Sequence, residues 1–159
     1  MASMETSIDN VRDWLDRKEW NYQFNAERNV IETGLKIHNK LQSTKMFIHF
    51  NENGEDFTVY AYCAMKAADE SRAAVAEYIG RANYGLRSGC FEMDYRDGEV
   101  RYKVYTNHRG YDHVNDALIE AAIFIPANMM ERYGDGLAAI CLGFSDPITE
   151  IEKAEAPRE

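Results

Sequence analysis

The chain has 159 residues, 45% of them hydrophobic, which suits one domain with one sizeable core. Its formal net charge of -9 argues against nucleic acid as a partner, because nucleic-acid binders gather lysine and arginine on one surface. The first twenty residues hold no basic segment followed by an apolar run, so they indicate neither a signal peptide nor a membrane anchor. Cys63, Cys90 and Cys141 stand far apart without a Cys-x-x-Cys pair. We therefore expect a cytoplasmic protein without a disulfide.

A short amphipathic helix is predicted near the start of the chain. Its apolar residues recur at helical spacing: Ile8, Val11, Trp14 and Leu15. Thr6 and Ser7 precede this stripe, and their hydroxyl groups are candidate N-caps.

A first hairpin is predicted directly after this helix. Apolar and polar residues alternate there, as expected of a half-buried strand. A two-residue turn at Arg28 and Asn29 places Phe24 opposite Thr33.

A second hairpin is indicated by Asn53-Gly54, because both central positions of a type I′ turn need a positive φ. The resulting register joins apolar residues: Phe50 with Phe57, Ile48 with Val59, and Met46 with Ala61. The reverse face of the same hairpin carries a second set of rings: Phe47, His49, Tyr60 and Tyr62. These four residues are our candidate interaction surface, because aromatic side chains are enriched at the centres of interfaces. The alternative is that the segment with Met129, Met130 and Tyr133 folds over them within one chain.

A second helix and a third hairpin follow. Asp69 is a candidate N-cap, and Gly85 can take the left-handed conformation that ends a helix. The third hairpin turns at Asp97-Gly98, and this register places Met93 opposite Tyr102 and Asp94 opposite Arg101.

The last third of the chain is predicted to be helical. Asp112 is a candidate N-cap, and Pro126 should kink or split the helix, because it cannot bond back to the carbonyl of Ala122. An apolar run ends at Phe144, and the charged residues 145–159 have few large apolar side chains. We therefore expect a single domain over residues 1–144 and a flexible tail over residues 145–159.

The segment from Ala73 to Val104, "AAVAEYIGRANYGLRSGCFEMDYRDGEVRYKV", resembles the central signature of the YbjN-like family of bacterial sensory transduction regulators. A weaker likeness extends to "VRDWLDRKEWNYQFNAERNVI" and to the terminal helices, as far as about Phe144. The resemblance implies an α+β fold, similar to that of type III secretion chaperones, in which an antiparallel sheet built from hairpins packs against helices. It implies no catalytic residue. The chain departs from the usual pattern at Pro126 and in its charged tail.

The remaining polar residues indicate no catalytic, cofactor-binding or metal site. The four histidines lack the spacing that a helix turns into metal ligands: His38, His49, His108 and His113. Glu92, Asp94, Arg101 and Lys103 are expected to form solvated ion pairs, each worth about 0 to 1 kcal/mol.

The sequence thus predicts a non-enzymatic regulatory or chaperone-like domain that binds a protein or peptide segment. We expect a homodimer that contacts neither nucleic acid nor membranes. The alternative function is a small-ligand sensor or enzyme that uses the polar loop from Asn107 to His113.

Overall fold

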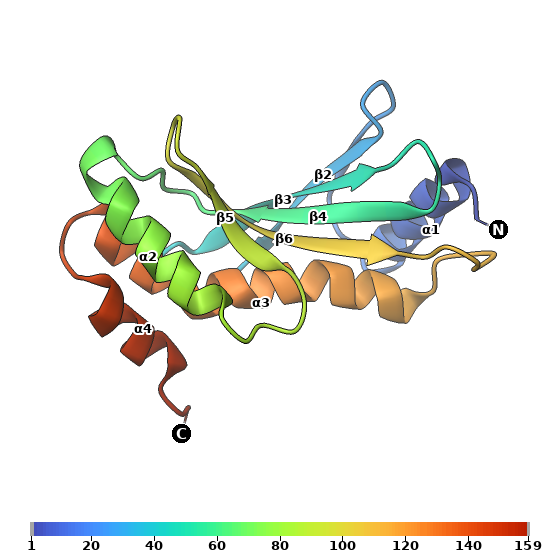
Figure 1. The fold of residues 1–159 in the computed structure, drawn as a ribbon. Coiled ribbons are helices and arrows are strands. Elements are labelled where there is room, and N and C mark those ends of the chain that lie inside the picture. The colour runs from blue at the N-terminus through green and yellow to red at the C-terminus, as the bar shows by residue number, and fades with distance from the viewer. Residues whose placement is uncertain (1, 159) are drawn as a thin grey trace.

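The computed structural model describes residues 2–158, which form a six-stranded antiparallel sheet with helices packed against it (Figure 1). The elements in chain order are α1 (Met4–Arg17), β1 (Gln23–Asn25), β2 (Val30–Lys36), β3 (Ser43–Phe50), β4 (Asp56–Tyr62), a 3-10 turn (Asp69–Ser71), α2 (Arg72–Asn83), β5 (Cys90–Asp94), β6 (Glu99–Asn107), α3 (Asp116–Cys141) and α4 (Pro147–Glu155). The strand order is β1-β2-β3-β4-β6-β5. The predicted α+β class is confirmed.

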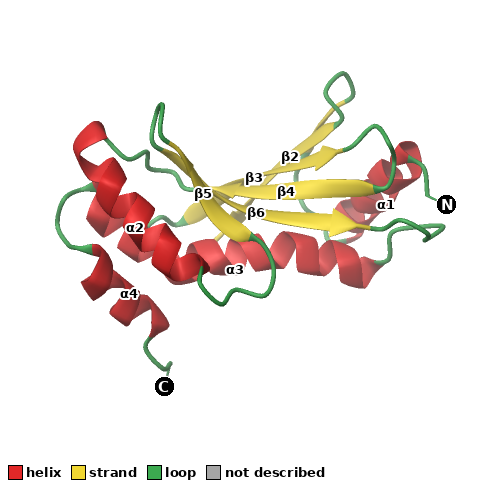
Figure 2. Cartoon of the chain, in the orientation of Figure 1, coloured by secondary structure: helices red, strands yellow, loops and turns green. Residues whose placement is uncertain are grey.

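The core lies between the sheet and the helices, which leave the other face of the sheet without a helix in the described residues (Figure 2). Alternate strand residues face inward because side chains of a strand alternate between its two sides. The helices contribute large buried rings, among them Trp14 of α1, Tyr78 of α2 and Tyr133 of α3. Trp14 also packs edge to face on Trp20, with ring centroids 5.4 Å apart. The sheet is therefore covered on one side only.

The predicted register of the second hairpin is confirmed, although its turn differs from the prediction. Phe50 pairs with Phe57, and the pairing continues to Met46 with Ala61. Gly54 has a φ of +71°, but Asn53 is not among the residues with positive φ, so the turn is not type I′. The side chain of Asn53 instead accepts a hydrogen bond from the amide of Glu55 at 2.8 Å.

The predicted registers of the other two hairpins are wrong by two residues. Phe24 pairs with Ile31 rather than Thr33, and Met93 pairs with Val100 rather than Tyr102. Both connections contain four residues, 26–29 and 95–98, where the prediction assumed two. A shift of two residues leaves every side chain on its predicted face, because the side-chain period of a strand is two.

The last residue of each four-residue connection takes the left-handed conformation. Asn29 has a φ of +53° and Gly98 a φ of +77°. In both hairpins the side chain of the residue before the connection accepts a backbone hydrogen bond: Asn25 from the amide of Arg28 at 3.1 Å, and Asp94 from the amide of Arg96 at 2.9 Å. These side-chain bonds explain why the wider loop is favoured.

The predicted N-caps of all three helices are wrong. Ser3 caps α1, and its hydroxyl accepts from the amide of Thr6 at 3.1 Å, which leaves Thr6 and Ser7 inside the helix. Asn115 rather than Asp112 caps α3. Asp69 opens the 3-10 turn before α2, and α2 itself has no side-chain cap.

The prediction for the last helix was a kink or a split at Pro126, and the split is wrong. Pro126 lies inside α3, which runs unbroken from Asp116 to Cys141. Proline removes only one amide donor, and the buried stripe of this long helix packs along the sheet on both sides of Pro126. Tertiary packing therefore outweighs the missing hydrogen bond.

The charged C-terminal segment forms helix α4, so the expected loose tail is wrong for Pro147–Glu155. Asp146 caps α4 by accepting from the amide of Thr149 at 2.9 Å. Arg132 of α3 donates to the carbonyl of Ala154 at 3.1 Å. Whether residues 1–144 form the domain by themselves stays a prediction.

Asn83 accounts for the Asn-Tyr-Gly sequence at the end of α2. Gly85 takes the predicted left-handed conformation, with a φ of +85°, and turns the chain toward β5. The side-chain Nδ2 of Asn83 donates to the carbonyl of Phe91 at 2.9 Å, and its Oδ1 accepts from the backbone amide of Phe91 at 2.7 Å. One side chain therefore takes the place of a neighbouring strand at the outer edge of β5.

Replacing Asn83 with Ala should lower the free energy of unfolding by about 1 to 3 kcal/mol, because both Phe91 groups lose their partner. Hydrogen exchange at the Phe91 amide should become faster. Glu77→Ala, an exposed change in the same helix, is the control and should leave that exchange rate unchanged. An Asn83→Ala variant with wild-type exchange at Phe91 would count against this role.

Gly98→Ala should destabilise the fold more than Gly110→Ala does. Both glycines have positive φ, so both changes cost about 1 to 3 kcal/mol of backbone strain. Only at Gly98 does the added Cβ also collide, at 1.9 Å from the carbonyl oxygen of Ala67, whereas nothing lies within 4 Å at Gly110. Urea unfolding of both variants tests this, and equal losses would show that the contact with Ala67 is unimportant.

Candidate functional site

The four predicted surface residues form one group on the uncovered side of the sheet. We call them the ring cluster: Phe47, His49, Tyr60 and Tyr62. Phe47 and Tyr62 meet edge to face with centroids 5.4 Å apart, and His49 and Tyr60 do so at 5.3 Å. His49 is exposed and the other three are half-buried. The ring cluster spans β3 and β4, whose pairing register brings Phe47 opposite Tyr60.

The intramolecular cover that we considered for the ring cluster is ruled out. Met130 and Tyr133 are buried on the opposite side of the sheet, in the core. The ring of Tyr133 contacts Phe91 there, with centroids 5.6 Å apart. The helix after Pro126 therefore packs away from the rings.

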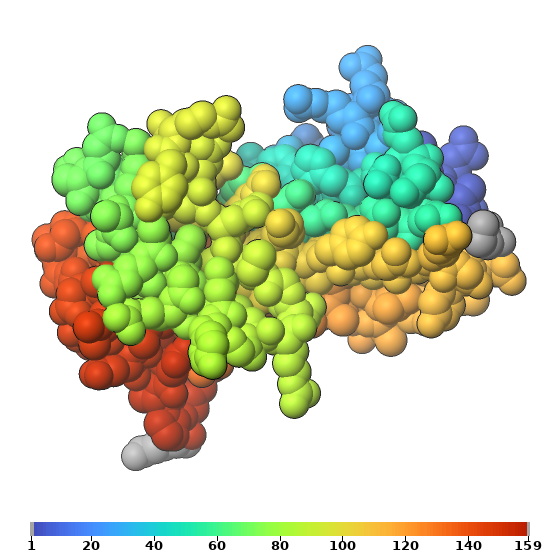
Figure 3. Space-filling view, viewed as in Figure 1, coloured from blue at the N-terminus to red at the C-terminus, as the bar shows by residue number. Residues whose placement is uncertain are grey.

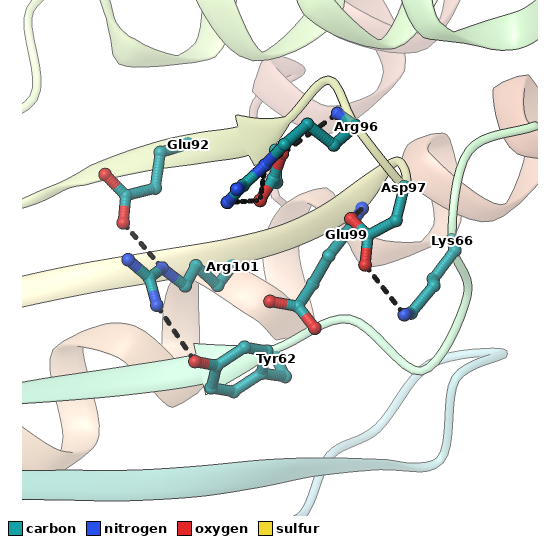
Figure 4. A network of polar contacts seen from close by, with 8 residues as sticks. Tyr62, Lys66, Glu92, Arg96, Asp97, Glu99 and Arg101 are labelled. Atoms are coloured by element: carbon teal, nitrogen blue, oxygen red, sulfur yellow. Dashed lines mark hydrogen bonds and ion pairs between the residues drawn. The ribbon is translucent and has the colours of Figure 1, made fainter. Parts of the chain in front are cut away.

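Arg101 of β6 contacts both tyrosines of the ring cluster, and Figure 4 shows its hydrogen bonds to Tyr62 and Glu92. Its guanidinium carbon lies 3.9 Å from the centroid of the Tyr60 ring, a cation–π contact. Its Nη1 donates to the hydroxyl of Tyr62 at 3.0 Å, and its Nε donates to Glu92 at 2.5 Å. The sequence prediction missed this contact, because it paired Arg101 with Asp94 and gave no sign that β4 lies beside β6.

Charges around Arg101 are paired, with one carboxylate shared by two cations. Glu92 accepts from Arg101 and also from Lys103 at 3.1 Å. Burial alone would raise the pKa of Glu92, but these hydrogen bonds outweigh it and lower that pKa. Hydrogen bonds from Arg96 lower the pKa of Asp94 to about 2. Of the predicted ion pairs, the one between Glu92 and Lys103 is present, whereas Asp94 pairs with Arg96 rather than with Arg101.

His49 carries little charge at neutral pH. Although His49 is exposed, its contacts with the neighbouring rings remove part of its solvation and lower its pKa, and the positive charges of Arg101 and Arg28 lower it further. The ring cluster therefore presents four uncharged rings.

Three cavities lie on this uncovered face, and together we call them the open-face groove. The first, about 730 Å³, lies beside the ring cluster and is lined by Gln23, Phe24, Asn25, Ala26, Glu27, Arg28, Val30, Glu32, Phe47, His49 and Tyr62. The second, about 520 Å³, shares Phe47 and Tyr62 with the first. The third, about 570 Å³, shares Glu99 with the second and reaches the β5–β6 connection. The space-filling view shows the surface dipping between the two outer hairpins (Figure 3).

The loop from Asn107 to His113, our alternative site, supports the N-terminal helix. His108 is only 1% exposed, and its Nε2 lies 3.1 Å from the hydroxyl oxygen of Ser7. That hydroxyl donates its own proton to the carbonyl of Ser3 at 3.0 Å, so Nε2 of His108 must be the donor. In a serine nucleophile activated by a histidine base, the serine hydroxyl donates to the histidine. Here the histidine donates to the serine, and both groups are buried.

Other reactive groups are scattered. Among residues 2–158 no group of three histidine, cysteine or carboxylate residues is placed to hold a metal ion. The cysteines are free, and burial raises the pKa of Cys63 to about 11, which keeps its thiol protonated. Within the same residues no helix has the length and apolar character needed to cross a membrane.

The buried His108 predicts a pH-dependent stability. Burial lowers its pKa against the opposing charges of Asp56 and Glu55. Below about pH 6.5 the unfolded chain therefore takes up a proton that the folded chain does not, so stability is full above this pH and falls below it. His108→Gln keeps a donor for Ser7 but does not titrate, so urea unfolding should vary less with pH. The same pH dependence in wild type and variant would contradict this.

One family model matches most of the chain. It describes YbjN, "Putative bacterial sensory transduction regulator", and matches residues 7–139. The match takes in all six strands, α2, and nearly all of α1 and α3, and leaves out α4. No curated protein matches the sequence at a significant level. Because the matched residues make up well over half of its length, the chain belongs to the YbjN family.

Proposed function

We propose that this regulator acts by binding another protein on the open-face groove and has no catalytic activity. Family membership supplies the regulatory role in sensory transduction. The proposal adds the surface and the mode of action, and it includes the predicted cytoplasmic location. The net charge of -9 supports a protein rather than a nucleic acid as the partner.

The ring cluster is the observation that carries this proposal. A sheet covered on one side needs only one apolar stripe, and the inward-facing residues of β3 and β4 already supply it. Burying an aromatic side chain contributes about 1.5 to 3 kcal/mol. A partner that covers the three half-buried rings therefore gains binding free energy from their remaining exposed surface. Arg101 keeps two of these rings in place before a partner arrives, which reduces the entropy lost on binding.

A small-ligand sensor or enzyme that uses the loop from Asn107 to His113 has less support. His108 is turned into the core, and Arg109 pairs with Glu55 at 3.6 Å on the surface. The predicted homodimer is a competing form of the same proposal, because a second copy would cover the same face.

Photo-cross-linking in the source cell tests whether another chain covers the ring cluster. Phe47 is replaced with p-benzoylphenylalanine, and the control places the same residue at Tyr84, which is 91% exposed and lies outside the groove. We expect covalent adducts with another protein at Phe47 and few at Tyr84. An adduct of twice the chain mass would show a homodimer instead. Equal labelling at both positions would refute the proposal.

A further inference from the structure

We propose that the open-face groove receives an extended, uncharged segment of about seven residues, with one large apolar side chain in its first cavity. This inference rests on the proposed function and adds the form and chemistry of the partner. It is carried by the continuity of the groove, its charge balance and the groups that line it.

The groove is continuous across the sheet. Phe47 and Tyr62 line both the first and the second cavity, and Glu99 lines both the second and the third. The β1–β2 and β5–β6 connections rise from the sheet near its two ends (Figures 1 and 3). Six strands about 4.8 Å apart span roughly 24 Å, which an extended chain covers with about seven residues.

Charges along the groove cancel, although the chain as a whole is strongly acidic. Five acidic residues line it (Glu27, Glu32, Glu92, Asp94 and Glu99), and so do five basic residues (Arg28, Lys45, Lys66, Arg96 and Arg101). The whole net charge of -9 therefore lies on the rest of the molecule. Three pairs of these charges already satisfy each other: Lys45 with Glu32, Arg96 with Asp94, and Arg101 with Glu92. Such a groove favours an uncharged segment, because a charged one would lose solvation and would have to compete with these ion pairs for a counter-charge.

A second copy fits this groove less well than a slender segment. Two hollow faces pressed together leave empty space between them, and good interfaces are closely packed. The acidic remainder of each copy also repels the other. The groove therefore suits a strand of chain rather than another sheet.

An extended backbone finds hydrogen-bond partners in the groove. Gln23 offers its side-chain amide beside the rings, and Asn25 offers its Nδ2, because its Oδ1 already accepts from Arg28. Nη2 of Arg101 has no hydrogen-bond partner in the described part of the chain. An extended segment exposes amide and carbonyl groups that need such partners, whereas a helix satisfies its own. This favours an extended occupant.

The first cavity is the place for an anchoring side chain. Its volume of about 730 Å³ lies within the usual range of ligand pockets. Phe47, Tyr62, His49 and Val30 offer rings and an aliphatic side chain, which suit an aromatic or long aliphatic group.

The test uses a phage-displayed library of random heptapeptides selected on the full chain. We expect selected peptides to be uncharged and to share one large apolar residue. The labelled peptides should bind His49→Lys about tenfold more weakly or worse, because the exposed His49 lines the first cavity and a lysine there adds a charge. Tyr84→Lys is the control and should bind as wild type does, and circular dichroism confirms that both variants fold.

Charged or helical selected peptides would overturn the inference, as would no selection or equal binding by His49→Lys. The Phe47 cross-linking result then shows which idea has failed. Adducts with another protein leave the proposed function standing, and an adduct only between two copies replaces the segment with a dimer. The absence of both adducts and selected peptides overturns the inference and the proposed function together.

Discussion

The pairing of β4 with β6 is the contact on which the rest of the structure depends. It runs from Asp56 opposite Asn107 to Tyr62 opposite Arg101, and it joins the second hairpin to the third across α2. Without it the chain would form one four-stranded sheet and a separate two-stranded hairpin, and such an isolated hairpin is only marginally stable in water. The same register brings a guanidinium from one hairpin onto the rings of the other. Both the core and the open-face groove therefore depend on the pairing of β4 with β6.

Local sequence patterns predicted the strands and their faces well. The alternation that separates Met46 from Phe47 needs no knowledge of neighbouring strands, and all four members of the ring cluster lie on the predicted side. Even where the predicted register was wrong, each side chain was placed on the correct face, because a register error of two residues does not change the face. The conformations of Gly85 and Gly98 were also predicted from neighbouring residues alone, and both glycines have the expected positive φ.

Non-local packing decided the features that the sequence did not reveal. Judged from its neighbours in sequence, Pro126 predicts a helix end. The helix nevertheless continues, because a long stripe of buried residues extends on both sides of Pro126. The partner of Arg101 depends on strands that are not consecutive in the chain, so no turn signal specifies it. The charged composition of α4 predicted a loose tail. Arg132 and Tyr133 of α3 bind the end of this helix, and composition alone does not reveal these contacts. These three errors concern contacts between segments far apart in sequence, whereas the errors in hairpin register and N-caps arose from local side-chain hydrogen bonds.

Asn83 has a consequence for how molecules of this protein can stack. A sheet that adds copies strand by strand into a fibre needs two free edges, one to receive and one to offer. At β5 the backbone groups of Phe91 are already taken by Asn83, and α2 lies alongside. The other edge of the sheet is β1, a strand of three residues, which offers little length for pairing with another copy. The side-chain amide of one asparagine thus takes up backbone groups that a neighbouring copy would need at the β5 edge, which disfavours open-ended polymerisation.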